Sequence, residues 1–278
     1  RTGAQAMGQG QMTTLPLILA QQLQVDVARI RIVQGDSDEV PGGIPTVASR
    51  STMMVGGAMG LAAEEAIRKG RGFAAELLEA AAADIEYGKG EFRVAGTDRR
   101  LGWRELTQKK GAALNTVATF TAPEMSFPNG CHVCEVEIDP ETGVVSVVGY
   151  AAVDDVGNIV HQAIVEGQIH GGVAQGLGQV LGEQVVYGDD GQLLTASFMD
   201  YTLPRADDLP MLALGHHVAP CATNPLGAKG AGESGVAGSL PAGVNAVLDA
   251  LAVRGVKHLD MPMTPQRVWQ ALQKGGKK

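Results

Sequence analysis

A glycine-rich segment with a single carboxylate is the part of the sequence best suited to chemistry. It covers residues 224–235 and reads NPLGAKGAGESG, with four glycines, one lysine and one acid, Glu233. Glycine has no Cβ, so such a segment can bring its backbone N–H groups against a ligand. One carboxylate in such a wall can act as a general base on one atom. The alternative is a surface turn with an exposed Glu.

Two other segments combine glycines or hydroxyls with the start of an expected helix. Gly8-Gln9-Gly10 places one amide side chain between two glycines, just before a helix predicted over residues 13–24. Residues 45–51, PTVASRS, place hydroxyl groups and Arg50 before another predicted helix. Free N–H groups at a helix start, hydroxyls and a guanidinium all bind phosphate-like anions. Serine and threonine are also ordinary helix caps, so each segment alone is a weak signal.

A glycine-rich helix predicted over residues 162–180 carries a pair of amides. Gln168 and Gln175 are seven residues apart and therefore share one face. Each glycine inside this helix costs about 1 kcal/mol relative to alanine, which close packing has to offset. Either a flat, polar ligand lies against the helix and bonds to the amides, or another backbone packs tightly on it and the glutamines face solvent.

Composition and charge exclude several classes of protein. The chain has 278 residues, of which 45% are hydrophobic and 19% charged, as is typical of a globular protein with a real core. A net charge of −8 and few aromatic residues disfavour nucleic-acid binding. No apolar run approaches the ~20 residues of a membrane helix, and no secretory signal is recognisable. We therefore expect a cytoplasmic protein without a membrane span.

Two motifs match known patterns but fail in context. Cys131 and Cys134 form a C-x-x-C, yet residues 131–138 are predicted to be a strand, in which positions three apart face opposite sides. No second pair completes a zinc site, and three cysteines give no disulfide framework. Residues 230–235 match G-x-G-x-x-G, but prolines precede them in place of a buried strand. Metal or redox chemistry at the cysteines and NAD or FAD binding at the glycines are disfavoured.

Periodicity and turn residues predict the elements that position these segments. Helices are expected over residues 13–24, 51–69, 73–83, 103–110, 162–180, 241–253 and 265–273. Strands are expected over residues 29–33 and 92–94, in a hairpin of 131–138 and 144–153, and in a second hairpin of 184–187 and 193–198. A turn-rich stretch over residues 121–130 divides the chain. The predicted fold class is α+β, with two mixed α/β subdomains over residues 1–122 and 123–278.

Five segments, in their order along the chain, resemble the C-terminal molybdenum-cofactor-binding part of the large subunit of molybdenum hydroxylases. The segments are residues 8–10, 45–51, 165–178, 198–205 and 224–235. The family includes xanthine dehydrogenase, aldehyde oxidase and aerobic carbon monoxide dehydrogenase. The resemblance is greatest to the bacterial carbon-monoxide-dehydrogenase type, and it covers nearly the whole chain. Five ordered motifs are far more specific than any one of them.

The resemblance implies roles for individual residues. Glu233 matches the active-site glutamate beside molybdenum, near the metal but not a firm ligand. In hydroxylating members it acts as a base on a Mo–OH, which attacks an electron-poor carbon while hydride passes to the Mo=S sulfur. The residues that the resemblance implies in cofactor binding are Gly8, Gln9, Gly10, Thr46, Ala48, Ser49, Arg50, Ser51, Gln168, Gln175, Lys229, Gly230 and Gly232.

The resemblance also implies a cofactor and partners. Bacterial members use molybdopterin cytosine dinucleotide, which is anionic, flat and rich in hydrogen-bonding groups. Electrons would leave through [2Fe–2S] and FAD groups on an iron–sulfur subunit and an FAD subunit. A further expected partner is the N-terminal half of the large subunit, on the same or a separate chain. That half carries most of the substrate pocket and the cysteine loop of copper-containing members.

Two classes of function therefore stay open at the level of sequence. The first is an oxidoreductase that hydroxylates an aldehyde or N-heterocycle, or oxidises carbon monoxide. The second is a non-catalytic dinucleotide-binding or assembly module. A lone carboxylate facing an anionic cofactor is of no use to a pure binding module, so Glu233 favours the enzyme.

Overall fold

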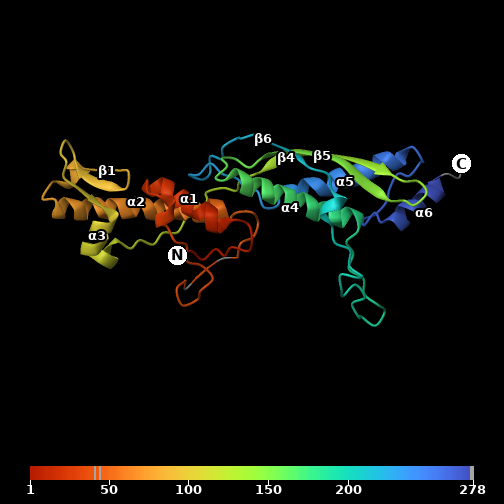
Figure 1. Cartoon of the computed structure of the whole chain (residues 1–278), viewed down its shortest axis with the longest axis horizontal. Helices are drawn as coiled ribbons and strands as arrows, with labels where there is room; N and C mark the ends of the chain where they lie inside the picture. The colour runs from red at the N-terminus through yellow and green to blue at the C-terminus, as the bar shows by residue number, and fades with distance from the viewer. Residues whose placement is uncertain (41, 44, 276–278) are drawn as a thin grey trace. The chain divides into compact units, whose positions relative to one another are not determined.

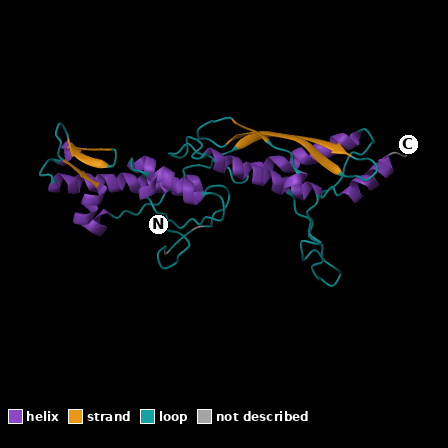
Figure 2. Ribbon diagram, in the orientation of Figure 1, coloured by secondary structure: helices purple, strands orange, loops and turns teal. Residues whose placement is uncertain are grey.

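The computed structural model describes residues 1–40, 42–43 and 45–275, and it contains two compact units (Figures 1 and 2). The first unit consists of Arg1–Ser126 and Pro220–Lys229. The second consists of Phe127–Ala219 and Gly230–Lys278. Each unit contains helices and one three-stranded sheet, so the α+β class is confirmed.

The first unit is built from two packed helices, a short third helix and a small antiparallel sheet. Helix α1 packs against α2, and the strands lie in the order β1-β2-β3. Its helices and strands are α1 (Gln11–Leu23), α2 (Ser51–Leu77), β1 (Ile85–Gly88), β2 (Glu91–Val94), β3 (Arg100–Gly102) and α3 (Trp103–Lys110). Short 3-10 turns cover Val27–Arg29, Ala82–Asp84 and Gly111–Leu114.

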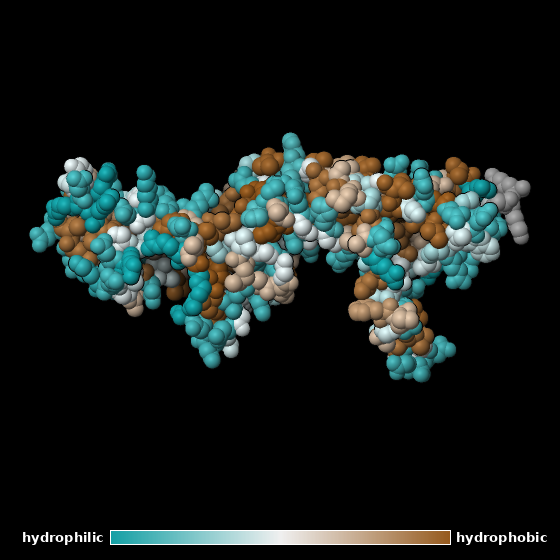
Figure 3. Space-filling view, viewed as in Figure 1, coloured by the Kyte–Doolittle hydropathy of each residue, from teal (hydrophilic) through white to brown (hydrophobic). Residues whose placement is uncertain are grey.

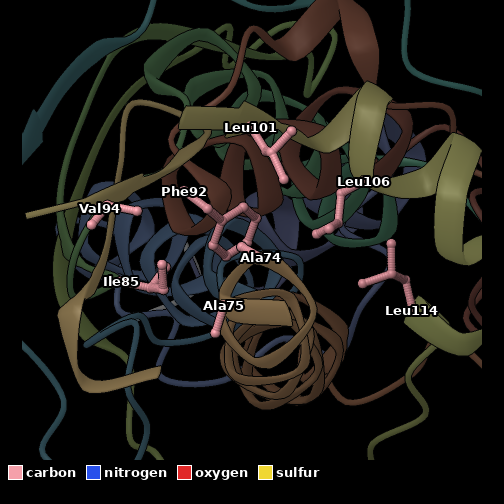
Figure 4. Packing of buried hydrophobic residues seen from close by; sticks show 8 residues of the cluster. All are labelled: Ala74, Ala75, Ile85, Phe92, Val94, Leu101, Leu106 and Leu114. Carbon is pink, nitrogen blue, oxygen red and sulfur yellow. The ribbon is translucent and has the colours of Figure 1, made fainter. Parts of the chain in front are cut away.

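Helix α2 is continuous where the sequence predicted two helices, over residues 51–69 and 73–83. Gly70 lies inside it and faces the fully buried ring of Phe92, which Figure 4 shows beside Ala74 and Ala75. A Cβ at Gly70 would overlap the ring, with Cε1 of Phe92 only 2.7 Å away. The prediction of a break was wrong because this glycine makes room for a ring rather than ending a helix.

Alanine substitutions at Gly70 and Gly72 should therefore change stability in opposite directions. We expect Gly70→Ala to lower the free energy of unfolding by about 1–3 kcal/mol, because the added methyl overpacks the core at Phe92. Gly72 lies in the same helix and has nothing within 4 Å of a Cβ position. Gly72→Ala should stabilise by up to about 1 kcal/mol through helix propensity. Denaturant unfolding measures both changes, and a Gly70 variant as stable as the Gly72 variant would contradict this packing.

The second unit is a hairpin, a short parallel strand and two packed helices. Strands β4 and β5 pair antiparallel, β6 pairs parallel to β5, and α5 packs against both α4 and β4. Its helices and strands are β4 (Asn129–Ile138), β5 (Val145–Asp155), α4 (Gln162–Leu181), β6 (Ala213–His216), α5 (Ser234–Ala252) and α6 (Pro265–Gly275), with a 3-10 turn at Ala206–Asp208. The predicted hairpin over residues 131–153, the glycine-rich helix and the C-terminal helix are confirmed.

Two predicted strand regions are wrong. Residues 30–33 have no regular secondary structure and pair with no strand among the described residues, and Val27–Arg29 is a 3-10 turn. The second hairpin, predicted over residues 184–198, forms only one bridge, between Tyr187 and Leu193. This segment projects from the second unit with a mixed apolar and polar surface (Figures 1 and 3). Tyr187 is 63% exposed, so the segment has no buried face to sustain strands.

Helix α5 is longer than predicted and begins at Ser234, with Pro241 inside it. Of the helices among the described residues, α5 alone is long and apolar enough to cross a membrane by length and composition, with a mean hydropathy of 1.2. The prediction that no apolar segment approaches the length of a membrane helix was therefore wrong. Every fourth residue of α5 is buried, namely Gly235, Ser239, Gly243, Val247 and Leu251. This stripe packs against α4 and β4, as a core helix does.

Candidate cofactor site

In the first unit, two of the predicted segments meet at one backbone carbonyl. Gln9 donates from Nε2 to the carbonyl oxygen of Gln5 at 3.1 Å, and Thr46 donates from Oγ1 to the same oxygen at 2.8 Å. Gly8 is exposed with φ +112°, and nothing lies within 4 Å of its Cβ position. The backbone at Gly8 is thus open to close approach by a ligand.

The turn that leads into α2 has an unusual backbone. Ala48 and Ser49 have φ values of +56° and +51°, the left-handed region that residues with a Cβ disfavour. Each such residue costs of order 1 kcal/mol, and strain of this kind concentrates at functional sites. Arg50 follows as the N-cap and is exposed, whereas Ser51 is buried. The strained turn makes the segment around Arg50 a candidate anion site on structural grounds as well.

Three helices start at predicted site residues, and none of the three has a side-chain cap. The N-cap residues are Gly10 for α1, Arg50 for α2 and Glu233 for α5. The first N–H groups of a helix need an acceptor, and the helix dipole makes that end favourable for negative charge. The pattern suits an anionic ligand such as a pyrophosphate.

In the second unit, glycines bring the start of α5 against α4. A Cβ at Gly235 would overlap the carbonyl oxygen of Ile169 and lie 2.9 Å from Cα of Gly172. Helix α5 therefore begins in backbone contact with α4, next to Gln168. Glu233 lies two residues before Gly235, and Gln168 directly precedes Ile169. The structure thus brings these two predicted residues into the same region of the second unit.

Some glycines of α4 serve tight packing against another backbone, and others leave the helix surface open to a ligand. Gly172, Gly176 and Gly178 face α5 or Pro204 so closely that a Cβ would clash, so they serve packing. Gly167 and Gly171 are exposed and have nothing within 4 Å of a Cβ position. Gln168 is half-buried and Gln175 is exposed. One face of the helix therefore packs, while another remains open for a ligand.

The Glu233 segment passes from the first unit to the second between Lys229 and Gly230. Lys229 is half-buried, Gly230 is buried, and Gly232 and Glu233 are exposed. Ser234 donates from Oγ to the carbonyl oxygen of Gly230 at 3.4 Å, which closes the last turn before α5. The carboxylate is thus carried on a short turn at the start of a rigid helix.

Two buried amides that the sequence did not single out also fit a polar ligand. Asn224 is 8% exposed and donates to the carbonyl oxygen of Ala228 at 2.9 Å, but its Oδ1 has no hydrogen-bond partner. Gln11, directly after Gly10, is 2% exposed, and its Oε1 also lacks a partner. Unsatisfied buried acceptors cost about 1–3 kcal/mol each. Donors such as the ring N–H groups of a pterin or base would satisfy them.

The cysteines do not form a second site. Cys131 is exposed, Cys134 is half-buried, and both are free thiols on opposite faces of β4. Burial raises the pKa of Cys134 to about 11, so its thiol stays protonated near neutral pH. Their placement on opposite faces agrees with the alternation predicted for this strand. Among the described residues, no group of three or more His, Cys, Asp or Glu side chains is placed to hold a metal ion.

Comparison with known proteins assigns the family. Residues 1–210 match the molybdopterin cofactor-binding domain. The chain is 37% identical to the carbon monoxide dehydrogenase large chain of Hydrogenophaga pseudoflava, over 98% of this chain and 35% of the relative.

Solved structures agree in fold. The reconstituted CO dehydrogenase from Oligotropha carboxidovorans superposes with a TM-score of 0.87 at 34% identity, over 98% of this chain and 35% of that one. Quinoline 2-oxidoreductase from Pseudomonas putida 86 gives a TM-score of 0.86 at 35% identity, over 98% and 36%. The chain spans about a third of the length of these relatives. It belongs to the molybdopterin cofactor-binding domain family of molybdenum hydroxylase large subunits.

Proposed function

We propose that the chain is the cofactor-binding part of an oxidoreductase in which Glu233 acts as the general base. The observation that carries this proposal is the backbone contact between Gly235 on α5 and Ile169 on α4. It fixes the start of the helix that carries Glu233 against α4, a helix with an open face and two amides. A base is effective only if it is held within hydrogen-bonding reach of its proton.

The remaining predicted residues would bind and orient the cofactor. The side chains of Gln9, Gln168 and Gln175 would bond to its flat polar ring system. The free N–H groups at the uncapped helix starts after Gly10 and Arg50 would donate hydrogen bonds to its phosphates. Thr46, Ala48, Ser49, Ser51, Gly8, Lys229, Gly230 and Gly232 would complete the contacts. The cofactor form proposed is molybdopterin cytosine dinucleotide, which when bound supplies oxygen-transfer and two-electron redox chemistry.

Glu233 would take the proton that this chemistry releases. Its carboxylate is exposed in this chain, whereas a base works best where water is excluded. We propose that the other part of the large subunit, which this chain does not include, covers Glu233 and excludes water from it. We also propose an iron–sulfur subunit and an FAD subunit as electron-transfer partners, and a cytoplasmic location for the complex.

The substrate classes proposed are carbon monoxide, aldehydes and N-heterocycles. Relatives of nearly equal identity are named for carbon monoxide and for quinoline, so this third of the subunit does not separate them. An assay of the purified complex with each class, using a dye as electron acceptor, tests the proposal. Oxidation of any one class supports it. A complex that holds a nucleotide and oxidises none would support the non-catalytic binding module instead.

A further inference from the structure

We propose that a buried cluster of His132, Tyr150 and Asp154 positions Glu233 by fixing the first two turns of α5. This inference rests on the proposed role of Glu233 as the base. The cluster lies wholly within the second unit, with His132 on β4 and the other two residues on β5. None of the three is among the residues proposed to bind the cofactor, and their effect would pass through the backbone of α5.

The cluster holds the imidazole ring in one orientation. Its Nδ1 lies 2.8 Å from the hydroxyl of Tyr150, and its Nε2 lies 3.3 Å from both carboxylate oxygens of Asp154. The side chains of His132 and Asp154 are only 3% and 4% exposed. A carboxylate can only accept, so Nε2–H donates to Asp154, and in the neutral ring Nδ1 then accepts from Tyr150. Burial raises the pKa of Tyr150 far above its usual range, which keeps its hydroxyl protonated as the donor.

The ring of His132 supports the backbone of α5 directly. A Cβ at Gly238 would lie 2.5 Å from Cγ and Nδ1 of His132, so only glycine fits at this position. On a neighbouring face of the helix, Gly235 meets the backbone of α4 at Ile169. The first two turns of α5 are therefore held between an aromatic ring and another helix. Glu233 immediately precedes these turns.

A polar cluster suits this position better than an apolar side chain of the same size. Buried polar groups are costly unless each has a partner, but a fully bonded network admits only one arrangement. An aliphatic side chain could change rotamer, and α5 could follow it. Misplacing a catalytic group by about 1 Å can cost about 10²-fold in rate. His132 is thus a positioning residue, which acts on Glu233 through Gly238.

The test uses His132→Phe in the assembled, molybdenum-loaded complex. Phenylalanine keeps a ring against Gly238 but loses both hydrogen bonds. We expect kcat to fall about 10- to 100-fold with unchanged molybdenum content. Val247→Ala is the control, since it removes fully buried volume from the same helix far from Glu233. It should lower the thermal stability and leave kcat unchanged. If His132→Phe gives too little protein, Tyr150→Phe removes one hydrogen bond and should lower kcat severalfold.

Two further readouts separate positioning from general stability. In a Glu233→Gln background, His132→Phe should have no additional effect on kcat, because both changes act on the same group. The crystal structure of His132→Phe should show Glu233 displaced, a result that needs no activity. Wild-type kcat in His132→Phe, or an undisplaced Glu233, would overturn the inference. Wild-type kcat in Glu233→Gln alone would instead overturn the proposed function.

Discussion

Glu233→Gln is expected to lower kcat by about 10²–10⁴-fold in the assembled complex, because an amide keeps the shape of the side chain but cannot take a proton. The exposed position of Glu233 at the N-cap of α5 means that the substitution removes little packing. Molybdenum content and thermal stability should therefore stay close to wild type. The quantity to measure is kcat per bound molybdenum atom.

Asp249→Asn provides the matched control for this experiment. Asp249 is an exposed acid on the same helix, distant from the N-cap, and its amidation removes the same charge. We expect it to leave kcat unchanged. A kcat near wild type in a Glu233→Gln complex with full molybdenum content would contradict the proposed role of Glu233 as the base.

Gly235→Ala is the second large effect, and it acts on structure as well as on activity. A methyl group there would overlap the carbonyl oxygen of Ile169 and approach the backbone N of Val173 to 2.9 Å. Backbone atoms inside a helix cannot move aside cheaply, so α4 and α5 have to separate. We expect a loss of about 3 kcal/mol in the free energy of unfolding, at the upper end of ordinary overpacking. Because the start of α5 moves, kcat should also fall at least as far as in His132→Phe.

The control for Gly235 is Gly171→Ala on α4. Gly171 is exposed, and nothing lies within 4 Å of its Cβ position. In the isolated chain this substitution should stabilise by up to about 1 kcal/mol through helix propensity. Denaturant unfolding of both variants measures the difference. Equal stability of the two variants would show that α4 and α5 are not packed through these glycines.

Elements with strong local signals could be predicted from the sequence. The hairpin of β4 and β5 follows from alternation around a turn, and α6 follows from Thr264 and Pro265 at a helix start. The errors depended on distant residues. The break predicted between residues 69 and 73 does not form, because Gly70 packs on Phe92, which lies 22 positions away in sequence and on another element. Residues 29–33 alternate as a strand does, but alternation does not supply a pairing partner.

The candidate site, too, could be predicted from the sequence only in part. Glu233 and Gln9 stood out because a polar side chain among glycines is unusual in composition alone. The unsatisfied oxygens of Gln11 and Asn224 cannot be predicted from the sequence, although both residues lie within or beside predicted segments, because burial is a property of the fold. His132 lies between two cysteines and has no sequence signal of its own, since its partners Tyr150 and Asp154 are on the next strand.

The most direct test of the central claim is the molybdenum and nucleotide content of the native complex. Elemental analysis gives molybdenum and copper, and mild acid releases the nucleotide. We expect stoichiometric molybdenum together with CMP, and copper alongside would favour carbon monoxide as the substrate. A freshly purified, intact complex without molybdenum would contradict the account, and it would leave Glu233 as an ordinary residue of a binding module.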